Sequence, residues 1–403
     1  MNNTINKEKL HKYLKLLLVV VIVIAVFYSE PLRENYNKAA IGELSEDVKV
    51  ETRFKLAQGV NYENIIFNNG KYRHRVHLME ADLKDPDCSI TLLLGENRAG
   101  GLEKLHDMIA YYDSTNLWEV VGAVNGSFWR KYNNFPIGPT IKDGEIIELK
   151  TYKKWSTCLF DQLNRPYFGY FTISGIVDMN SGNKLKIASV NRRRDSTGVV
   201  LYNRYGGDSI PYIRYEQFDD EIDEAVMSVL EDRPFSDSTE EEFDIEKFKA
   251  ELIRSERAAA KEYSLNKAVL IYHDKPAINR EIVCKIVYLK SGAVNVPRNG
   301  CVISFGEDIP ISMYPESGDL VTIKFSTNTY KDVVFKNGVS AVPRLVRNGI
   351  ANPEAEKEGA TSRRFINSKL PRTAIGTNKA QTKLYLAVVQ RGDRREGING
   401  ASL

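Results

Sequence analysis

The stretch Arg75-Val76-His77-Leu78-Met79-Glu80-Ala81-Asp82-Leu83 (residues 75–83) decides the fold class, because its side chains alternate with the period of a strand. Val76, Leu78 and Asp82 fall on one face, and His77 falls on the other. Similar short apolar runs predict further strands at residues 90–94, 120–124, 268–273, 282–289, 301–305, 320–325 and 384–389. Helical spacing is sparse and is clearest at 102–111. The pattern predicts an α+β fold with a mixed, mostly antiparallel sheet flanked by helices.

The composition is that of a folded protein. The chain has 403 residues, of which 42% are hydrophobic and 27% charged. These values exclude wholesale disorder and a membrane protein with many spans. Lys+Arg total 56 and Asp+Glu total 53, which gives a net charge of +3. This even balance argues against a nucleic-acid partner, which would require a marked basic excess.

The N-terminus has the pattern of an export or anchor signal. Lys7, Lys9, Lys12 and Lys15 precede an unbroken apolar run at 16–28, and no Ala-x-Ala cleavage site follows. We expect a cytoplasmic basic tail (1–12), a transmembrane signal anchor (13–28) and a stalk (29–55), with the main domain outside the cytoplasm. Two alternatives stay open. The segment could be a cleaved signal that releases a secreted protein, or a buried core helix.

Cysteines and histidines give no metal or cofactor signature. Cys88, Cys158, Cys284 and Cys301 include no Cys-x-x-Cys pair, and the five histidines are scattered. An oxidising compartment would allow three disulfide connectivities, and buried free thiols are equally compatible with the sequence. We therefore predict neither a metal nor a cofactor. Familiar catalytic signatures, such as Gly-x-Ser-x-Gly and the P-loop, are also missing from the sequence.

The sequence of residues 216–262 predicts an acidic helical insertion. Pro234 separates two helical patterns, at 221–230 and 245–263, and Asp237-Ser238-Thr239 offers N-caps for the second. This segment either docks a protein partner, attracts cations or is a solvated helix face. It matches no EF-hand spacing.

Three segments carry residues suited to a polar ligand. In the first, Asn125-Gly126-Ser127-Phe128 follows a predicted strand and precedes the turn Asp143-Gly144. An Asn side chain can both donate to and accept from sugar hydroxyls, and an adjacent aromatic ring can cover a sugar. The other two segments are Pro343-Arg344-Leu345 and Pro371-Arg372-Thr373-Ala374-Ile375-Gly376. Arginine makes bidentate contacts to phosphate or carboxylate. Read alone, Asn-Gly also fits a tight turn, and each arginine also fits a structural ion pair.

In this order, these segments resemble the phosphodiester glycosidase family. The resemblance begins near Gly59-Val60-Asn61-Tyr62 and implies one domain over 56–403 that contains the acidic insertion. It implies cleavage between the anomeric carbon of a sugar and a phosphodiester oxygen, with catalytic roles for Asp82, Asn125 and Arg372. Arg372 would hold the phosphate, Asn125 would orient the sugar, and Asp82 would supply the carboxylate. A turn-capping role for Asp82 is an equal alternative. The further residues expected to contact the substrate are Gly126, Ser127, Phe128, Arg344, Thr373 and Gly376.

The chain departs from the family pattern in two places. The family's Asp-Gly-Gly-Gly-Ser loop is not in this sequence, and Gln390-Arg391-Gly392 stands where the family has Asp-Gly-Arg. We expect a C-terminally incomplete domain in preference to a degenerate member. The expected function is a membrane-anchored glycosidase that acts on sugar-phosphate substrates in envelope glycans or exopolysaccharide. The alternatives are a non-catalytic glycan-binding or polymer-assembly protein, and an interaction protein that works through its acidic helices.

Overall fold

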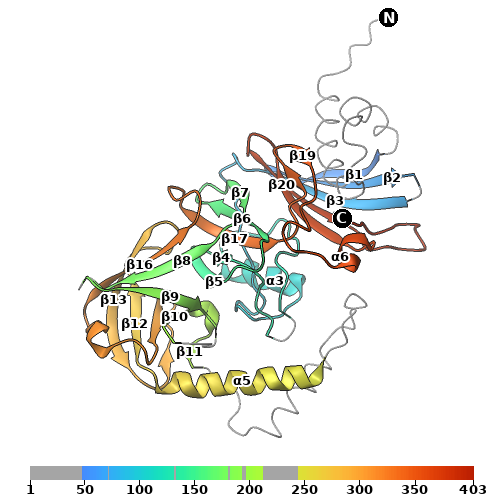
Figure 1. Cartoon of the computed structure of the whole chain (residues 1–403). Helices are drawn as coiled ribbons and strands as arrows, with labels where there is room; N and C mark the ends of the chain where they lie inside the picture. The colour runs from blue at the N-terminus through green and yellow to red at the C-terminus, as the bar shows by residue number, and fades with distance from the viewer. Residues whose placement is uncertain (1–47, 71, 131–132, 180–181, 193–196, 212–243) are drawn as a thin grey trace, which may run out of the picture.

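Strands dominate the structure and divide among three larger sheets (Figure 1). The computed structural model describes residues 48–70, 72–130, 133–179, 182–192, 197–211 and 244–403. The predicted basic tail, signal anchor and first acidic helical pattern, together with most of the predicted stalk, lie outside these residues. Within the described ranges, no helix is both long and apolar enough to span a bilayer.

The first sheet has the strand order β1-β2-β3-β21-β20. The predicted strand at 75–83 is the greater part of β3, and its alternation is confirmed because Val76 and Leu78 are buried. With Phe67 and Tyr385 they form the core of this sheet. The strand bounds are β1 Val48–Ala57, β2 Val60–Asn69, β3 Tyr72–Asp82, β20 Arg372–Thr377 and β21 Lys383–Val389. Since β1 begins at Val48, the predicted stalk extends too far: its end at 55 falls inside a paired strand.

The second sheet closes into a barrel with the order β10-β15-β12-β13-β16-β8-β9. In β8 the residues alternate: Ile173 and Val177 are buried on the face that lines the barrel interior, whereas Ile176 is exposed on the other face. The bounds are β8 Ile173–Asp178, β9 Lys184–Val190, β10 Val199–Asn203, β12 Lys267–Tyr272, β13 Glu281–Lys290, β15 Gly300–Phe305 and β16 Leu320–Thr327.

The third sheet has the order β5-β4-β17-β6-β7 and joins the other two. Leu159 and Phe335 belong to the same buried cluster as the barrel residues, whereas Cys158 and Phe160 pack with Leu384 of the first sheet. The bounds are β4 Thr140–Lys142, β5 Glu145–Glu148, β6 Ser156–Asp161, β7 Pro166–Gly169 and β17 Phe335–Ala341. The third sheet therefore contributes buried side chains to two hydrophobic clusters, one shared with the barrel and one shared with the first sheet.

The predicted turn Asp143-Gly144 connects β4 to β5. Both residues have positive φ, +51° and +82°, as a two-residue hairpin turn requires. A Cβ on Gly144 would lie 1.9 Å from the carbonyl oxygen of Pro276, so the close approach of the third sheet to the barrel also requires glycine here.

Two small sheets and a few helices complete the described fold. The small sheets pair β11 Ser209–Ile210 with β14 Val294–Asn295, and β18 Val346–Arg347 with β19 Ile350–Ala351. The helices are α3 Leu105–Thr115, α5 Ile245–Ser264 and α6 Arg363–Asn367, with 3-10 turns η2 Arg204–Gly206 and η3 Ile311–Met313. The second predicted acidic helix is therefore present as α5. Its N-cap is Asp244, whose side chain accepts from the Lys247 amide at 3.0 Å, and not the predicted 237–239.

The expectation of mostly antiparallel strands is confirmed: among the ladders of the described residues, only β9 and β10 run parallel. The expectation of a single sheet flanked by helices is corrected to three sheets and three separate α-helices within the described part. A single sheet with this many strands would curl or split. The strands therefore divide into several sheets, each with one face packed against a core. The strands predicted at 90–94 and 120–124 are also wrong. Neither segment joins a strand ladder with the described residues, because apolar side chains alone do not supply a neighbouring strand to pair with.

Candidate functional site

An open cavity lies beside the junction between the first and third sheets. The cavity is large, about 2950 Å³, and its lining includes residues of segment 118–129, of β6 and β17, and of β20 with the turn before it, as well as residues of segment 87–105, α3 and α5. Eight of the nine predicted site residues line it: Asn125, Gly126, Ser127, Phe128, Arg344, Arg372, Thr373 and Gly376. Asp82 does not line it. The structure therefore brings segments near residues 125, 344 and 372 into one space, although they are distant in sequence.

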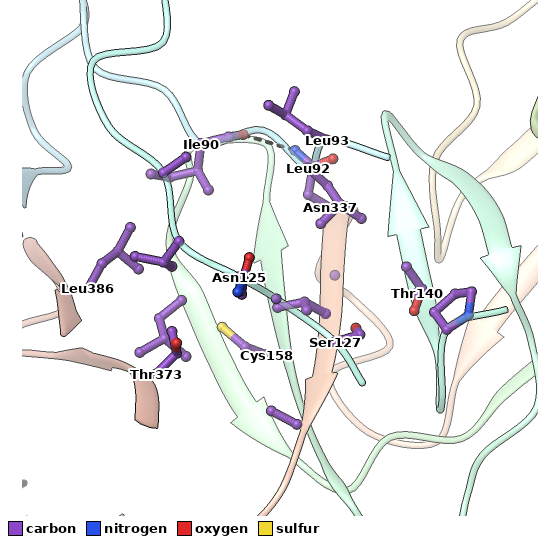
Figure 2. Close-up of a pocket in the computed structure, with 18 of the residues that line it drawn as sticks. Ile90, Leu92, Leu93, Asn125, Ser127, Thr140, Cys158, Asn337, Thr373 and Leu386 are labelled. Carbon is purple, nitrogen blue, oxygen red and sulfur yellow. Dashed lines mark hydrogen bonds between the residues drawn. The ribbon is translucent and has the colours of Figure 1, made fainter. Parts of the chain in front are cut away.

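Asn125 and Ser127 present unused hydrogen-bonding groups to this cavity. The Asn125 side chain is exposed and makes no hydrogen bond with the described residues. In Figure 2 its amide lies in the same part of the cavity as Cys158 and Thr373. The Ser127 Oγ is buried and likewise has no partner within the described chain. Buried polar groups are normally satisfied, so an unsatisfied hydroxyl beside a cavity is a candidate for contact with water or a ligand.

Arg372, the first residue of β20, is held by main-chain carbonyls. Its Nε donates to Ala401 at 3.0 Å, and its Nη2 donates to Phe365 at 2.5 Å and to Ser368 at 3.3 Å. Nη1 makes no hydrogen bond to the described residues. Burial lowers the pKa of the Arg372 guanidinium to about 10. No carboxylate of the described chain forms an ion pair with this charge, so the site holds a half-buried cation that an anion could neutralise.

Arg344 follows the cis peptide Val342–Pro343 and is also half-buried. Its main-chain amide donates to Glu358 Oε1 at 3.1 Å, but its Nη2 is buried without a hydrogen-bond partner among the described residues. Burial lowers the pKa of the Arg344 guanidinium, and the positive charge of Arg347 lowers it further. Two arginines thus line one cavity with donor groups still available.

Glu358 is a supporting residue that the sequence analysis missed. It is buried, and besides the Arg344 amide it accepts from the Ser156 amide at 3.2 Å and the Ser156 hydroxyl at 2.6 Å. These bonds connect β6 to the turn that carries Arg344. Its neighbour Glu354 accepts both Nε (3.1 Å) and Nη2 (2.6 Å) of Arg347. Arg347 is therefore neutralised, whereas Arg344 is not bonded to either carboxylate by its side chain. The sequence does contain a signal for these contacts, because Glu354 and Glu358, four residues apart, follow soon after Arg344 and Arg347.

Asp82 lies at the end of β3 in a different setting. Lys383 Nζ donates to its Oδ2 at 2.6 Å, and the Lys84 amide donates to Oδ1 at 3.0 Å. The hydrogen bond from Lys383 holds the pKa of the Asp82 carboxyl below its usual range. This geometry matches the alternative stated above, a carboxylate that caps a turn. Within the described residues, no three His, Cys, Asp or Glu side chains gather where they could hold a metal ion.

The sequence comparisons agree with the predicted resemblance over the C-terminal part of the chain. A family model described as phosphodiester glycosidase matches residues 279–403. This region holds Arg344 and Arg372, so the resemblance predicted from their motifs is confirmed there. No protein of curated function gives a significant match.

The solved structures that match this chain include the following two. A hypothetical protein from Synechocystis is 17% identical, with a TM-score of 0.52, over 86% of this chain and 52% of its own. A putative exported protein from Burkholderia pseudomallei is 13% identical, with a TM-score of 0.45, over 82% of this chain and 64% of its own. The chain thus spans about half the length of the first of these relatives. At such identity the first comparison shows the fold alone.

Proposed function

We propose that this protein is an extracytoplasmic phosphodiester glycosidase that hydrolyses sugar-1-phosphodiester bonds in envelope glycans or exopolysaccharide. Anchoring through residues 13–28 belongs to the same proposal and rests on their sequence pattern. The observation that carries the proposal is the pair of arginines, Arg344 and Arg372, which line one cavity with Asn125 and whose side chains bond to no carboxylate of the described residues. The family match over residues 279–403 supports the same chemistry.

The charges explain why cations would promote this reaction. Water adds to the anomeric carbon, the carbon–oxygen bond breaks, and its electron pair passes to the phosphate oxygen. A proton from the water is released. The phosphate therefore changes from a monoanionic diester to a more negative monoester. Groups that bind the product-like charge more strongly than the initial charge lower the barrier. Arg372 Nη1 and the Arg344 guanidinium are suited to that role, while Asn125 and Ser127 would orient the sugar hydroxyls.

Asp82 is assigned a structural role in this proposal, because Lys383 already pairs with its carboxylate. Because the predicted catalytic carboxylate is paired and lies outside the cavity, a second candidate is also favoured. This candidate is a protein of the same fold that binds glycans without cleaving them. The two functions differ in a single measurable property, the release of free sugar.

The direct test incubates the full chain with the methyl phosphodiester of N-acetylglucosamine 1-phosphate and measures reducing sugar over time. Release by the wild type, with a drop in kcat/KM of about 10- to 100-fold in Arg344→Ala, supports the glycosidase. Arg395→Ala is the matched control, because Arg395 is exposed and only its main-chain amide bonds to Asp393. Binding that depends on Arg344 without sugar release would establish the second candidate. Neither binding nor release would reject both.

A further inference from the structure

We propose that a glycan subsite formed by Phe128, Trp155 and Tyr152 adjoins the cavity at Phe128, which lines it, and binds an anionic saccharide chain beyond the phosphodiester. These three residues are called the aromatic wall below. The inference rests on the proposed function for the position of the cleaved bond, and it deepens that function by naming a saccharide chain with a phosphate in each repeat as the substrate class. Two of its three residues, Tyr152 and Trp155, lie outside the segments that carry the family resemblance.

The rings run in sequence away from Arg372. The Arg372 guanidinium lies over Phe365, with its Cζ 4.9 Å from the ring centroid. Phe365 meets Phe128 edge-to-face at 6.0 Å, and Phe128 meets Trp155 at 5.6 Å. Trp155 in turn meets Tyr152 at 4.9 Å with the planes 83° apart. The series therefore connects the cation of the proposed phosphate site to the outer surface.

The outer rings are open to a ligand. Phe128 is 45% exposed and Tyr152 is 37% exposed, which is high for large rings that contact one another. An edge-to-face contact covers less ring surface than a stacked pair, because only one of the two rings turns a face toward the other. The Trp155 indole Nε1 is buried and has no hydrogen-bond acceptor among the described residues. Apolar ring faces together with a free donor suit a sugar, which presents C–H groups on its faces and hydroxyls on its edge.

The charge beside the aromatic wall selects the kind of saccharide. The segment Tyr152-Lys153-Lys154-Trp155 places two lysines between two of its rings. Lys153 Nζ donates to the Gly359 carbonyl at 2.6 Å and lies 5.5 Å from the centre of the Tyr152 ring, and Lys154 is exposed. A chain with a phosphate in each repeat would satisfy the rings and the ammonium groups together. A neutral saccharide would use the rings alone.

The experiment compares ligands that differ only in length and charge. Isothermal titration of the full chain measures Kd for three probes: the methyl phosphodiester monomer, a phosphate-bridged tetramer of the same sugar, and a neutral tetrasaccharide. The wild type should bind the phosphate-bridged tetramer at least about tenfold more tightly than the monomer. Tyr152→Ala should reduce this preference by about three- to tenfold. Tyr288→Ala, in β13 with 38% exposure, should leave it unchanged.

Lys154→Glu provides a second variant whose fold does not depend on an aromatic contact. It should weaken the phosphate-bridged tetramer by several-fold and leave the neutral tetrasaccharide unchanged. An unaltered preference for the tetramer in Tyr152→Ala and Lys154→Glu, both shown by circular dichroism to be folded, overturns the aromatic wall as a subsite. Failure of the proposed function has a different outcome: no sugar is released from any probe, while tetramer binding still depends on Tyr152.

Discussion

The Arg372 guanidinium covers the ring of Phe365 and donates to the carbonyl oxygen of the same residue. One side chain thus fixes the end of α6 to the start of β20, and its bond to Ala401 fixes the C-terminal segment as well. The residue proposed to bind phosphate also holds together the elements around it. Loss of activity after its substitution would therefore have two causes, which stability measurements can separate.

Arg372→Ala should lower the free energy of unfolding by about 1–3 kcal/mol, because it leaves carbonyls of α6 and Ala401 without their donor. Chemical denaturation monitored by tryptophan fluorescence measures this change. A fully stable Arg372→Ala protein would contradict the structural half of its role.

Arg344→Met should behave in the opposite way. The Arg344 guanidinium makes no hydrogen bond to the described residues, and its Nη2 is buried. Removing an unsatisfied buried charge costs little and often stabilises, so the melting temperature should stay equal or rise. Substrate affinity should fall in the same variant. Differential scanning calorimetry alongside titration with the phosphodiester monomer checks both, and a clear drop in melting temperature would mean that Arg344 is a structural residue.

Asp82→Asn should retain activity and change the acid sensitivity of the fold. The folded pKa of Asp82 lies below its unfolded value of about 3.9, so the ion pair with Lys383 stabilises the protein above that value. This stabilisation is lost as the pH falls through the folded pKa. At 30% exposure the pair should contribute less than about 1 kcal/mol. Unfolding curves between pH 2 and pH 6 should therefore converge for wild type and variant at the acid end. Loss of sugar release in Asp82→Asn would instead show that the Asp82 carboxylate has a catalytic role.

Glu145 should make the protein less stable as the pH rises from about 4.3 to about 7. Burial raises the pKa of its carboxyl to about 7, although Arg204 and Tyr272 both donate to it. Between the unfolded value of about 4.3 and pH 7 the folded state binds more protons than the unfolded state, so this group's contribution to stability falls as the pH rises through that window. Glu145→Gln should show a smaller loss of stability than wild type between pH 5 and pH 8. Equal losses would show that Glu145 is ionised at pH 5.

The four cysteines are free in the structure, which selects the free-thiol alternative over the disulfide connectivities. Cys158, Cys284 and Cys301 are buried, and burial raises the thiol pKa of each. A thiol reagent should therefore modify Cys88 slowly in the native protein and all four cysteines in guanidinium. Mass spectrometry counts the additions. Fewer than four after denaturation without reductant would indicate a disulfide.

Sequence periodicity predicted the elements whose pattern of buried and exposed residues is visible within the segment itself. The alternation around Val76 and Leu78 gave β3, and helical spacing gave α5. The segment 120–124 has the apolar character of a strand, but a strand also needs a neighbour. Pairing depends on residues far away in sequence, which a local period does not encode. The partition of strands into a barrel and two sheets was missed for the same reason.

The candidate site shows the same division. The residue types that can bind a sugar phosphate were visible at Asn125, Arg344 and Arg372, and the structure gathers them around one cavity. The hydrogen-bond partners of these side chains could not be predicted from the sequence. The Ala401 carbonyl that accepts from Arg372, for example, lies 29 residues away along the chain. Asp82 matched a motif, and only the position of Lys383 in the neighbouring strand shows why its carboxylate is occupied.

The placement of β20 at the end of the first sheet affects how the protein behaves in concentrated solution. A closed barrel has no free margin, but an open sheet ends in strands that can recruit another chain. At the opposite end, β1 carries Lys49, Arg53 and Lys55, and such charges discourage self-association. β20 pairs with β21 alone among the described strands, and its single charged residue, Arg372, is turned toward α6. The margin that borders the cavity is therefore the less protected of the two against pairing with a strand of another chain.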